Sequence, residues 1–149
     1  PIDAKRQPQG EYDAKFSVPY AVATALCKGR FSLTELEDAA RLDTEVLDLA
    51  QRIDCAHDAR SRYPDAFSGG VKITLRDGSE LEHFELVNRG AEGRALSHDE
   101  VRGKFLENCA LTISRELAEQ LWDALIHLDE MNDVAALTAL LRTGASGAD

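Results

Sequence analysis

The sequence is poor in positive charge and has no long apolar run. It contains 17 lysine and arginine residues against 27 aspartate and glutamate residues, which gives a net charge of −10. Proteins that bind the phosphate backbone of nucleic acids need a basic face, so this balance argues against a nucleic-acid partner. No apolar run approaches the roughly 20 residues of a membrane helix, and no signal-like segment opens the chain. We therefore expect a cytoplasmic protein that binds neither nucleic acid nor membrane.

Residues that ligate metals or act as nucleophiles are few and scattered. The three cysteines are too widely spaced for a disulfide framework or a metal-binding pair, and the four histidines show no HxxxH spacing. Cys27 and Cys109 lie among apolar residues, where a small core side chain is expected. The glycine patterns of nucleotide-binding loops and of serine hydrolases are missing as well. These absences predict that the chain holds no metal.

The length and composition are those of a folded protein. The chain has 149 residues, of which 44% are hydrophobic, and this suffices for one domain with a core or for one domain with an appendage. It begins with Pro1, and its single methionine is Met131. These two features are compatible with a piece of a longer protein.

The first thirty residues predict one buried helix after an extended start. Residues 1–10 contain two prolines, a glycine and few apolar side chains, so we expect an extended lead-in. The run at residues 20–27 is apolar on every side, which favours a buried helix. Ser17 is positioned to cap this helix, and Gly29 is positioned to end it.

The next segment predicts a second helix and then a short strand. Ser32 and Glu35 have the spacing of a capping box, in which each side chain accepts from the backbone N–H of the other residue. A further helix is expected from about Thr44, where apolar residues recur at helical spacing. Residues 53–57 alternate between apolar and polar side chains, which predicts a strand.

A β-hairpin is expected around Asp77 and Gly78. Apolar and polar residues alternate over residues 71–76, directly before this Asp-Gly pair. A two-residue loop would place Ile73 opposite Glu82. A three-residue loop with Gly78 in the left-handed conformation places Ile73 opposite Leu81 instead. The second register keeps apolar partners on one face, so we predict it.

The last third of the sequence predicts helices. Ser97 and Glu100 form a second capping box, and leucines from Leu117 to Leu128 follow helical spacing. Asp133 can cap a final helix that is rich in leucine and alanine. Helices, a small antiparallel sheet and further helices give an α+β fold class.

One polar segment stands out as a candidate site. Lys15, Ser17 and Tyr20 lie together at the entry of the apolar helix. Helix N-termini attract anions, and lysine and hydroxyl groups would complement a carboxylate ligand. The residues alone leave the alternative open that Ser17 is only a cap, Tyr20 a core residue and Lys15 a solvated charge.

The same segment resembles the MmgE/PrpD family, which includes 2-methylcitrate dehydratase, cis-aconitate decarboxylase and iminodisuccinate epimerase. The resemblance rests on the order and spacing of several short motifs along nearly the whole chain. These motifs are Lys15-Phe16-Ser17-x-Pro19-Tyr20-x-Val22-Ala23, Tyr63-Pro64, Val71-x-Ile73-x-Leu75-x-Asp77-Gly78, Arg89-Gly90 and Leu96-Ser97-x-x-Glu100-x-x-x-Lys104-Phe105. One departure is Ala95, where the family usually has proline.

The resemblance implies a division of the chain and a partner. Residues 1–112 would form a small α+β domain that covers a cleft, residues 113–143 would be helices that pack on a larger helical domain, and residues 144–149 a tail. That helical domain precedes this region in the family and is not among these 149 residues. The resemblance also implies frequent homodimers and no cofactor.

The resemblance further implies site residues and a reaction class. Tyr20 matches a catalytic tyrosine that faces the cleft, and Lys15 and Ser17 are candidates for substrate carboxylate contact. The expected function is that of the C-terminal part of a lyase, a dehydratase or decarboxylase of a small di- or tricarboxylate, inactive without the helical domain. The alternatives are a non-catalytic binding or assembly module of the same fold, an epimerase or isomerase of the family, and an unrelated acidic interaction domain.

Overall fold

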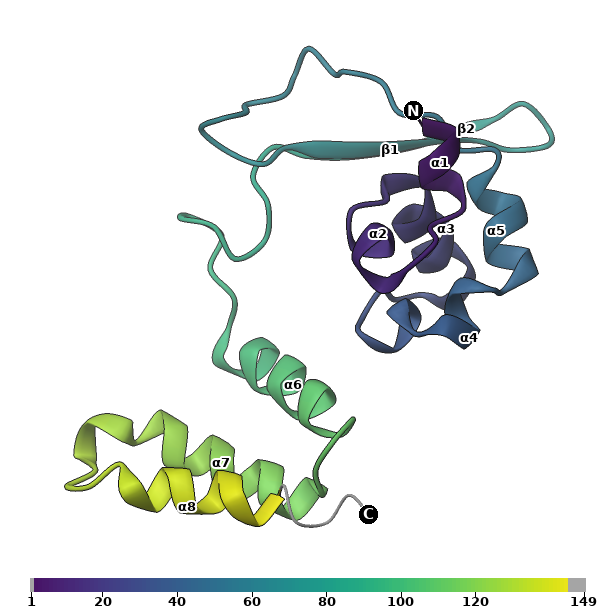
Figure 1. Ribbon diagram of the computed structural model, residues 1–149. Coiled ribbons are helices and arrows are strands. Elements are labelled where there is room, and N and C mark those ends of the chain that lie inside the picture. The colour runs from purple at the N-terminus through teal and green to yellow at the C-terminus, as the bar shows by residue number, and fades with distance from the viewer. Residues whose placement is uncertain (1, 145–149) are drawn as a thin grey trace. The chain divides into compact units, whose positions relative to one another are not determined.

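The computed structural model describes residues 2–144, and the chain divides into two compact units, Pro1–Ala59 and Arg60–Asp149. Within the described residues, helices and one two-stranded antiparallel sheet make up the regular structure (Figure 1). The fold class is therefore α+β, as the sequence predicts. None of the described helices has the length and hydrophobicity needed to cross a membrane.

The N-terminal unit gathers short helices around one central helix (Figure 1). Its core consists of small and aliphatic side chains around one tyrosine: Ala14, Tyr20, Ala23, Leu36, Val46 and Ala50. The elements are α1 (Ile2–Arg6), α2 (Glu11–Lys15), α3 (Val18–Lys28), the 3-10 helix η1 (Thr34–Leu36), α4 (Asp38–Arg41) and α5 (Thr44–Ala50).

The start of the chain differs from the sequence-based expectation. The extended lead-in predicted for residues 1–10 is wrong, because α1 forms a turn of helix there. Long-range contacts hold this turn in place: Lys5 pairs with Asp13, and the Arg6 guanidinium donates to the Ile53 carbonyl at 3.2 Å. The sequence around Arg6 does not indicate that its partner, Ile53, lies 47 residues further along the chain.

Helix α3 begins and ends where the sequence predicts. The Ser17 side chain accepts from the backbone N–H of Tyr20, and Gly29 ends the helix in the left-handed conformation with φ of 74°. The helix is not buried on every side, however, because Val18 and Leu26 on its outer face are exposed. An apolar face of α3 therefore remains open to solvent.

The strand predicted at residues 53–57 is absent, and this prediction is wrong. The segment is an irregular stretch after α5, with Cys55 and His57 exposed. A strand needs a neighbour for its backbone groups, and the carbonyl of Ile53 is already bonded to the Arg6 side chain. Alternation of side chains alone does not supply that neighbour.

The hairpin confirms the predicted three-residue loop. Strand β1 (Gly69–Thr74) pairs antiparallel with β2 (Glu80–Glu85), and Ile73 lies opposite Leu81. Gly78 has a φ of 84°, which a residue with a side chain rarely adopts. On one face of the hairpin, Phe84 lies across from Gly70, and the Arg60 guanidinium stacks 4.1 Å from the Phe84 ring centroid.

Three helices and a short 3-10 turn complete the C-terminal unit. They are α6 (His98–Cys109), α7 (Arg115–Ile126), η2 (Leu128–Glu130) and α8 (Ala135–Gly144). Both hydrogen bonds of the capping box between Ser97 and Glu100 form, and the Ser114 side chain caps α7. Helix α7 contacts both α6 and α8, and the ring of Trp122 on α7 lies 5.4 Å from that of Phe105 on α6.

Gly70 provides a test of the hairpin geometry. A Cβ at this position would lie 2.6 Å from Phe84 Cδ2 and 3.1 Å from the His83 carbonyl oxygen. We expect Gly70→Ala to displace the Phe84 ring and to lower the local stability of the hairpin by about 1–2 kcal/mol. Amide hydrogen exchange of β1 and β2 measures this change. Gly69→Ala is the matched control, since nothing lies within 4 Å of its added Cβ, and an equal effect of both changes would contradict the argument.

His127 at the end of α7 predicts a pH-dependent contribution to stability. Its Nδ1 lies 2.8 Å from the Asp123 carbonyl oxygen, and this hydrogen bond, with the charges of Asp123, Glu130 and Asp129, raises the pKa of His127. Because the pKa of His127 is raised in the folded state, the protonated imidazole contributes its full stabilisation below the ordinary pKa near 6.5. That stabilisation is lost as pH rises through the pKa of the folded state.

We expect His127→Gln to lower the melting temperature at about pH 5 more than at about pH 8.5. Thermal unfolding followed by circular dichroism measures the difference. His57→Gln, in the exposed segment after α5, serves as the control. An equal loss at both pH values would show that protonated His127 does not stabilise the end of α7.

Candidate functional site

The predicted site residues lie at the junction of two helices. Helix α2 ends at Lys15, two residues follow, and α3 begins at Val18. Ser17 is extended and caps α3, and Pro19 occupies the first turn, where a missing N–H leaves no intrahelical bond unmade. The sequence therefore brings the three side chains close along the chain, but the fold directs them to different surroundings.

Ser17 is a buried structural residue of this junction. Its side chain is 1% exposed, and its Oγ accepts from the Tyr20 N–H at 3.1 Å. The hydroxyl also donates to the Lys5 carbonyl, which joins α1 to the start of α3. Because its one proton is already donated, Ser17 has no hydroxyl donor left for a ligand in this conformation.

Tyr20 is the largest side chain that is fully buried in the N-terminal unit. It is 0% exposed, and its hydroxyl donates to the backbone carbonyl of Glu35 at 2.6 Å. The Phe31 ring packs edge-on against it, with the centroids 6.0 Å apart. Burial raises the pKa of the Tyr20 phenol, so the hydroxyl stays protonated at neutral pH. In this state it can donate a hydrogen bond but cannot act as a base.

Lys15 lies outside this buried pair. Its ammonium forms an ion pair of 2.7 Å with Glu11, one turn earlier on α2, and both side chains are exposed. Pairs of this kind contribute little, about 0.3–0.5 kcal/mol, because water and salt screen them. A carboxylate ligand could therefore attract Lys15 away from Glu11 at small cost. The structure thus brings Ser17 and Tyr20 together and leaves Lys15 on the surface.

Glu35 is a buried carboxylate of this region, and its spacing from Ser32 predicts only a helix cap. Its side chain is buried and accepts from the Ser32 N–H at 2.9 Å, from the Ser32 hydroxyl at 2.7 Å and from Arg30 at 2.8 Å. Burial alone would raise the pKa of Glu35, but the hydrogen bonds from Ser32 and the charge of Arg30 outweigh it and lower that pKa. The carboxylate is therefore ionised, and Ser32 and Arg30 supply the hydrogen bonds that it needs when buried.

Only half of the capping box predicted at Ser32 and Glu35 forms. The Glu35 carboxylate accepts from the Ser32 backbone, as predicted, but the Ser32 hydroxyl turns to the carboxylate rather than accepting from the Glu35 N–H. A 3-10 helix follows instead of a regular α-helix. The spacing of serine and glutamate predicted the contact, whereas the burial of the carboxylate depends on the helices around it.

Other reactive side chains do not gather around this junction. Within residues 2–144, no group of three or more histidine, cysteine, aspartate or glutamate side chains is arranged to hold a metal ion. Cys27 lies partly buried on α3, and burial raises the pKa of its thiol, the opposite of what a nucleophile requires. At this junction the exposed Lys15 ammonium is the group open to a ligand, because the hydroxyls of Ser17 and Tyr20 already donate to backbone carbonyls.

Comparison with known proteins identifies the family. Residues 1–130 match the family described as the MmgE/PrpD C-terminal domain. The chain belongs to this family. The predicted resemblance is thereby confirmed over most of the sequence, and the described core and hairpin are the structure of an MmgE/PrpD C-terminal domain.

Two curated relatives are cis-aconitate decarboxylases. The mouse protein (Mus musculus) is 24% identical over 138 residues, and the human protein (Homo sapiens) is 21% identical over 141 residues. Each match covers 91% of this chain but only 28% of the relative. This MmgE/PrpD C-terminal domain therefore spans between a quarter and a third of the length of the curated relatives it matches.

The buried hydroxyls predict a measurable contribution to the stability of α3. Tyr20→Phe keeps the ring but leaves the Glu35 carbonyl without its donor, so we expect a loss of about 1–2 kcal/mol. Ser17→Ala removes the helix cap and the donor to Lys5, and we expect at least the same loss, about 1–2 kcal/mol. Amide hydrogen exchange of α3 measures both.

Tyr12→Phe is the matched control for the phenol, because Tyr12 is exposed on α2 and loses the same hydroxyl. We expect it to leave the exchange of α3 unchanged. If Tyr20→Phe were as neutral as Tyr12→Phe, the bond to Glu35 would not stabilise the unit.

Proposed function

We propose that this chain is the C-terminal part of a cofactor-independent MmgE/PrpD-type lyase, a dehydratase or decarboxylase of a small di- or tricarboxylate. The observation that carries the proposal is the family match over residues 1–130, together with similarity to proteins named cis-aconitate decarboxylase. Because the chain spans 28% of those relatives, we propose that it acts together with a helical domain and is inactive without it.

The proposed chemistry is one of two eliminations: a dehydratase removes a proton next to a carboxylate and expels hydroxide that an acid protonates to water, whereas a decarboxylase expels carbon dioxide and adds a proton to the carbanion that remains. Such a reaction needs an acid and a base, together with groups that hold the substrate carboxylates in place. Burial raises the pKa of Tyr20, so its phenol stays protonated at neutral pH and can donate a hydrogen bond, and proton donation would require the bound substrate to lower that pKa. Its hydroxyl faces the Glu35 carbonyl, so a substrate would have to replace that acceptor.

Lys15 and Ser17 take different parts in this proposal. Lys15 is exposed and only weakly held by Glu11, which supports a direct contact with a substrate carboxylate. Ser17 is held by Lys5 and Tyr20, which supports a role in fixing the turn that carries Tyr20 rather than the contact to substrate that the resemblance implies. Both roles are part of the proposal.

A second candidate function is a non-catalytic binding or assembly module of the same fold. It is favoured by the hydrogen bonds of Ser17 and Tyr20, since the fold itself uses both hydroxyls. In this case the two residues would be kept for stability, and their loss would change folding without changing any reaction. The two candidates therefore differ in what substitution of Tyr20 does to a rate.

The lyase proposal is tested by turnover with and without the missing part. We expect no decarboxylation of cis-aconitate by the purified 149-residue chain. We expect activity when the chain is co-expressed with mouse cis-aconitate decarboxylase from which the segment similar to this chain has been deleted. Carbon dioxide release measures both. Turnover by the chain alone at rates typical of an enzyme would overturn the proposal, because a complete acid–base set would then lie within these residues.

In that assembled system, Tyr20→Phe should lower kcat by roughly 100-fold, because a positioned acid contributes at least that much. Ser17→Ala should have a much smaller effect on kcat although it destabilises α3 at least as strongly. Tyr12→Phe again serves as the control. Equal and small effects of Tyr20→Phe and Ser17→Ala would remove Tyr20 from the site and support the binding module.

A further inference from the structure

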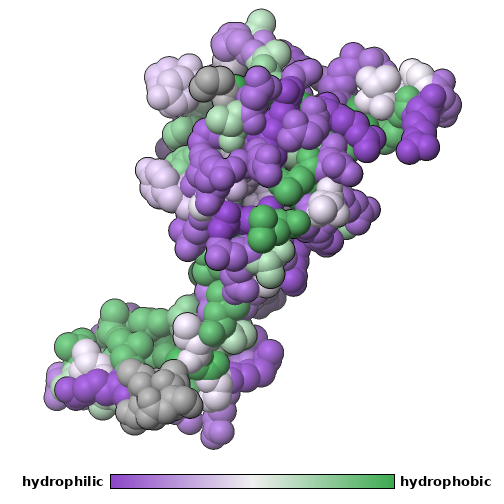
Figure 2. All heavy atoms as spheres, turned by 45° about the vertical axis from the view of Figure 1, so that its right-hand side comes forward, coloured by the Kyte–Doolittle hydropathy of each residue, from purple (hydrophilic) through white to green (hydrophobic). Residues whose placement is uncertain are grey.

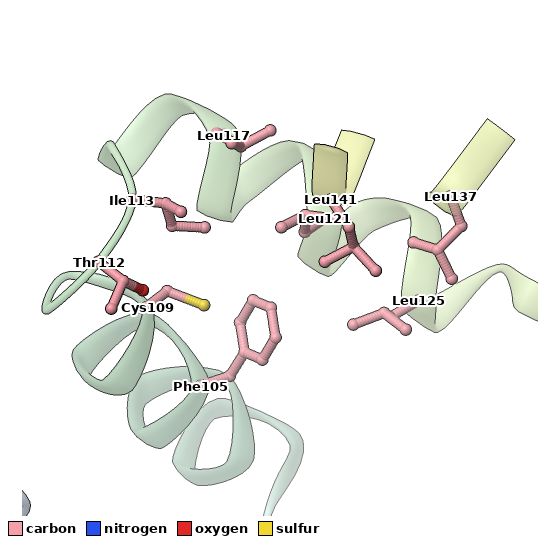
Figure 3. A pocket seen from close by; sticks show the side chains of 9 residues that line it. All are labelled: Phe105, Cys109, Thr112, Ile113, Leu117, Leu121, Leu125, Leu137 and Leu141. Carbon is pink, nitrogen blue, oxygen red and sulfur yellow. The ribbon is translucent and has the colours of Figure 1, made fainter. Parts of the chain in front are cut away.

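The C-terminal unit contains an apolar groove between α6, α7 and α8. The groove has a volume of about 260 Å³, and none of the nine residues that line it is charged. Figure 3 shows Phe105 of α6 and leucines of α7 and α8 directed into this space. Figure 2 shows hydrophobic residues gathered on the same helices. The groove supplies no charged group for a reaction, and the polar group that still lacks a role lies in the N-terminal unit.

That group is the hydroxyl of Thr24, in the middle of α3. Thr24 is 2% exposed. Among residues 2–144, its Oγ1 is the one buried side-chain polar atom without a hydrogen bond of normal geometry. In helices a threonine hydroxyl often bonds to the carbonyl one turn earlier, but this one does not. A buried polar group without a partner destabilises a fold, so its presence requires an explanation.

The neighbour of this hydroxyl is the phenol of Tyr20, one turn earlier on α3. Residues four positions apart lie on the same face of a helix, and both of these side chains are buried. The Thr24 hydroxyl acts on the phenol directly, since it lowers the pKa of Tyr20 against the larger effect of burial. Thr24 therefore faces the reactive end of the tyrosine.

The two groups have complementary hydrogen-bonding capacity. The Tyr20 phenol donates its proton to the Glu35 carbonyl at 2.6 Å, and its oxygen keeps lone pairs for a donor. The Thr24 hydroxyl has a proton to donate. Hydrogen bonds to an ionised oxygen are shorter and about twice as strong as those to a neutral one. The Thr24 hydroxyl is thus better suited to a tyrosine that has lost its proton than to the resting phenol.

The charged groups around the phenol act in opposite directions. Arg41 on α4 lowers the pKa of Tyr20, whereas Glu35 on η1 and Asp43 at the start of α5 raise it. The Arg41 guanidinium is engaged elsewhere, because it donates to the Leu36 carbonyl at 3.1 Å and pairs with Asp38. A carbonyl such as that of Glu35 can only accept a hydrogen bond and offers nothing to a phenolate. A donor hydroxyl supplies what these groups do not.

We propose that Thr24 is a positioning residue for Tyr20, whose hydroxyl donates to the phenol oxygen and stabilises the phenolate that remains when Tyr20 gives its proton to a substrate. This inference rests on the proposed function. In that step the O–H bond of Tyr20 breaks and its electron pair stays on the oxygen. The proton goes to the substrate carbanion or to the leaving hydroxide. The phenolate then regains a proton through water before the next turnover.

The contact is tested first on the full 149-residue chain, without any reaction. Tyr12→Phe and Tyr63→Phe leave Tyr20 as the only tyrosine, which is then replaced by the more acidic fluorotyrosine. Fluorine NMR follows its ionisation as pH rises. Thr24→Val keeps the shape of the side chain but removes the hydroxyl, so the midpoint should move up by about one pH unit. Thr24→Ser should restore it. Thr74→Val, at an exposed threonine of β1, is the matched control.

A merely structural Thr24 predicts a different pattern. Loss of an unpaired buried hydroxyl would raise the melting temperature of Thr24→Val and leave the midpoint of Tyr20 unchanged, and this result would overturn the proposal. A raised midpoint that Thr24→Ser does not reverse would overturn it as well. If valine packs poorly at this position, Thr24→Ala and Thr24→Ser give a second comparison, because these two variants differ only by the hydroxyl.

The second test is turnover in the co-expressed system described above. We expect Thr24→Val to lower kcat about tenfold with little change in KM, and Thr24→Ser to restore it. An undiminished kcat of Thr24→Val, where Tyr20→Phe is impaired, would contradict the positioning role. A system without activity, or one in which Tyr20→Phe is neutral, would contradict the lyase proposal instead. The NMR titration would then still decide whether the Thr24 hydroxyl donates to the phenol.

Discussion

The hydrogen bond from the Tyr20 hydroxyl to the Glu35 carbonyl joins the parts of the N-terminal unit. Tyr20 belongs to the central helix α3, and Glu35 belongs to η1, which the chain reaches only after leaving α3 at Gly29. The carboxylate of Glu35 also accepts hydrogen bonds from Ser32 and Arg30. Glu35 therefore holds the segment between α3 and η1 through its side chain and through its backbone carbonyl. The packing of Leu36 against Tyr20 and Ala23 depends on this arrangement.

This interaction also limits what the candidate site can do. A hydroxyl that stabilises a core cannot serve a ligand without a replacement for the carbonyl it leaves, and an unpaired buried carbonyl costs about 1–3 kcal/mol. Binding of a dicarboxylate near Tyr20 would have to supply that energy. Lys15 can leave its partner Glu11 without that cost, because Glu11 is on the surface, where water replaces the lost contact. The charged residue is therefore the one most readily available to a substrate, whereas the Tyr20 hydroxyl is already bonded to the Glu35 carbonyl.

The sequence was informative where the physics is local. Helix caps at Ser17 and Ser97, and the tight turn at Gly78 that sets the hairpin register, involve residues within four positions of each other, so their spacing determines the contact. Helix α1 and the irregular segment after α5 could not be predicted in this way, because Arg6 binds the Ile53 carbonyl across 47 residues. The same limit applies to the site. Residue type and spacing drew attention to Lys15, Ser17 and Tyr20, but only the packing of α1 and η1 determines that two of them are buried.

Both units share one physical property, apolar surface that the described chain does not cover. On α3 it is an outer face with Val18 and Leu26, and in the C-terminal unit it is the groove with Leu125 and Leu141. The hairpin adds a third case, because a two-stranded sheet is marginal by itself and Leu81 on its apolar face is exposed. A net charge of −10 disfavours contact between copies of this chain where acidic residues gather, which leaves uncharged faces as the places where apolar burial costs least. Helix α3 is uncharged from Val18 to Cys27, and residues 134–141 are uncharged as well, so a partner on either face would bury apolar area without burying a charge.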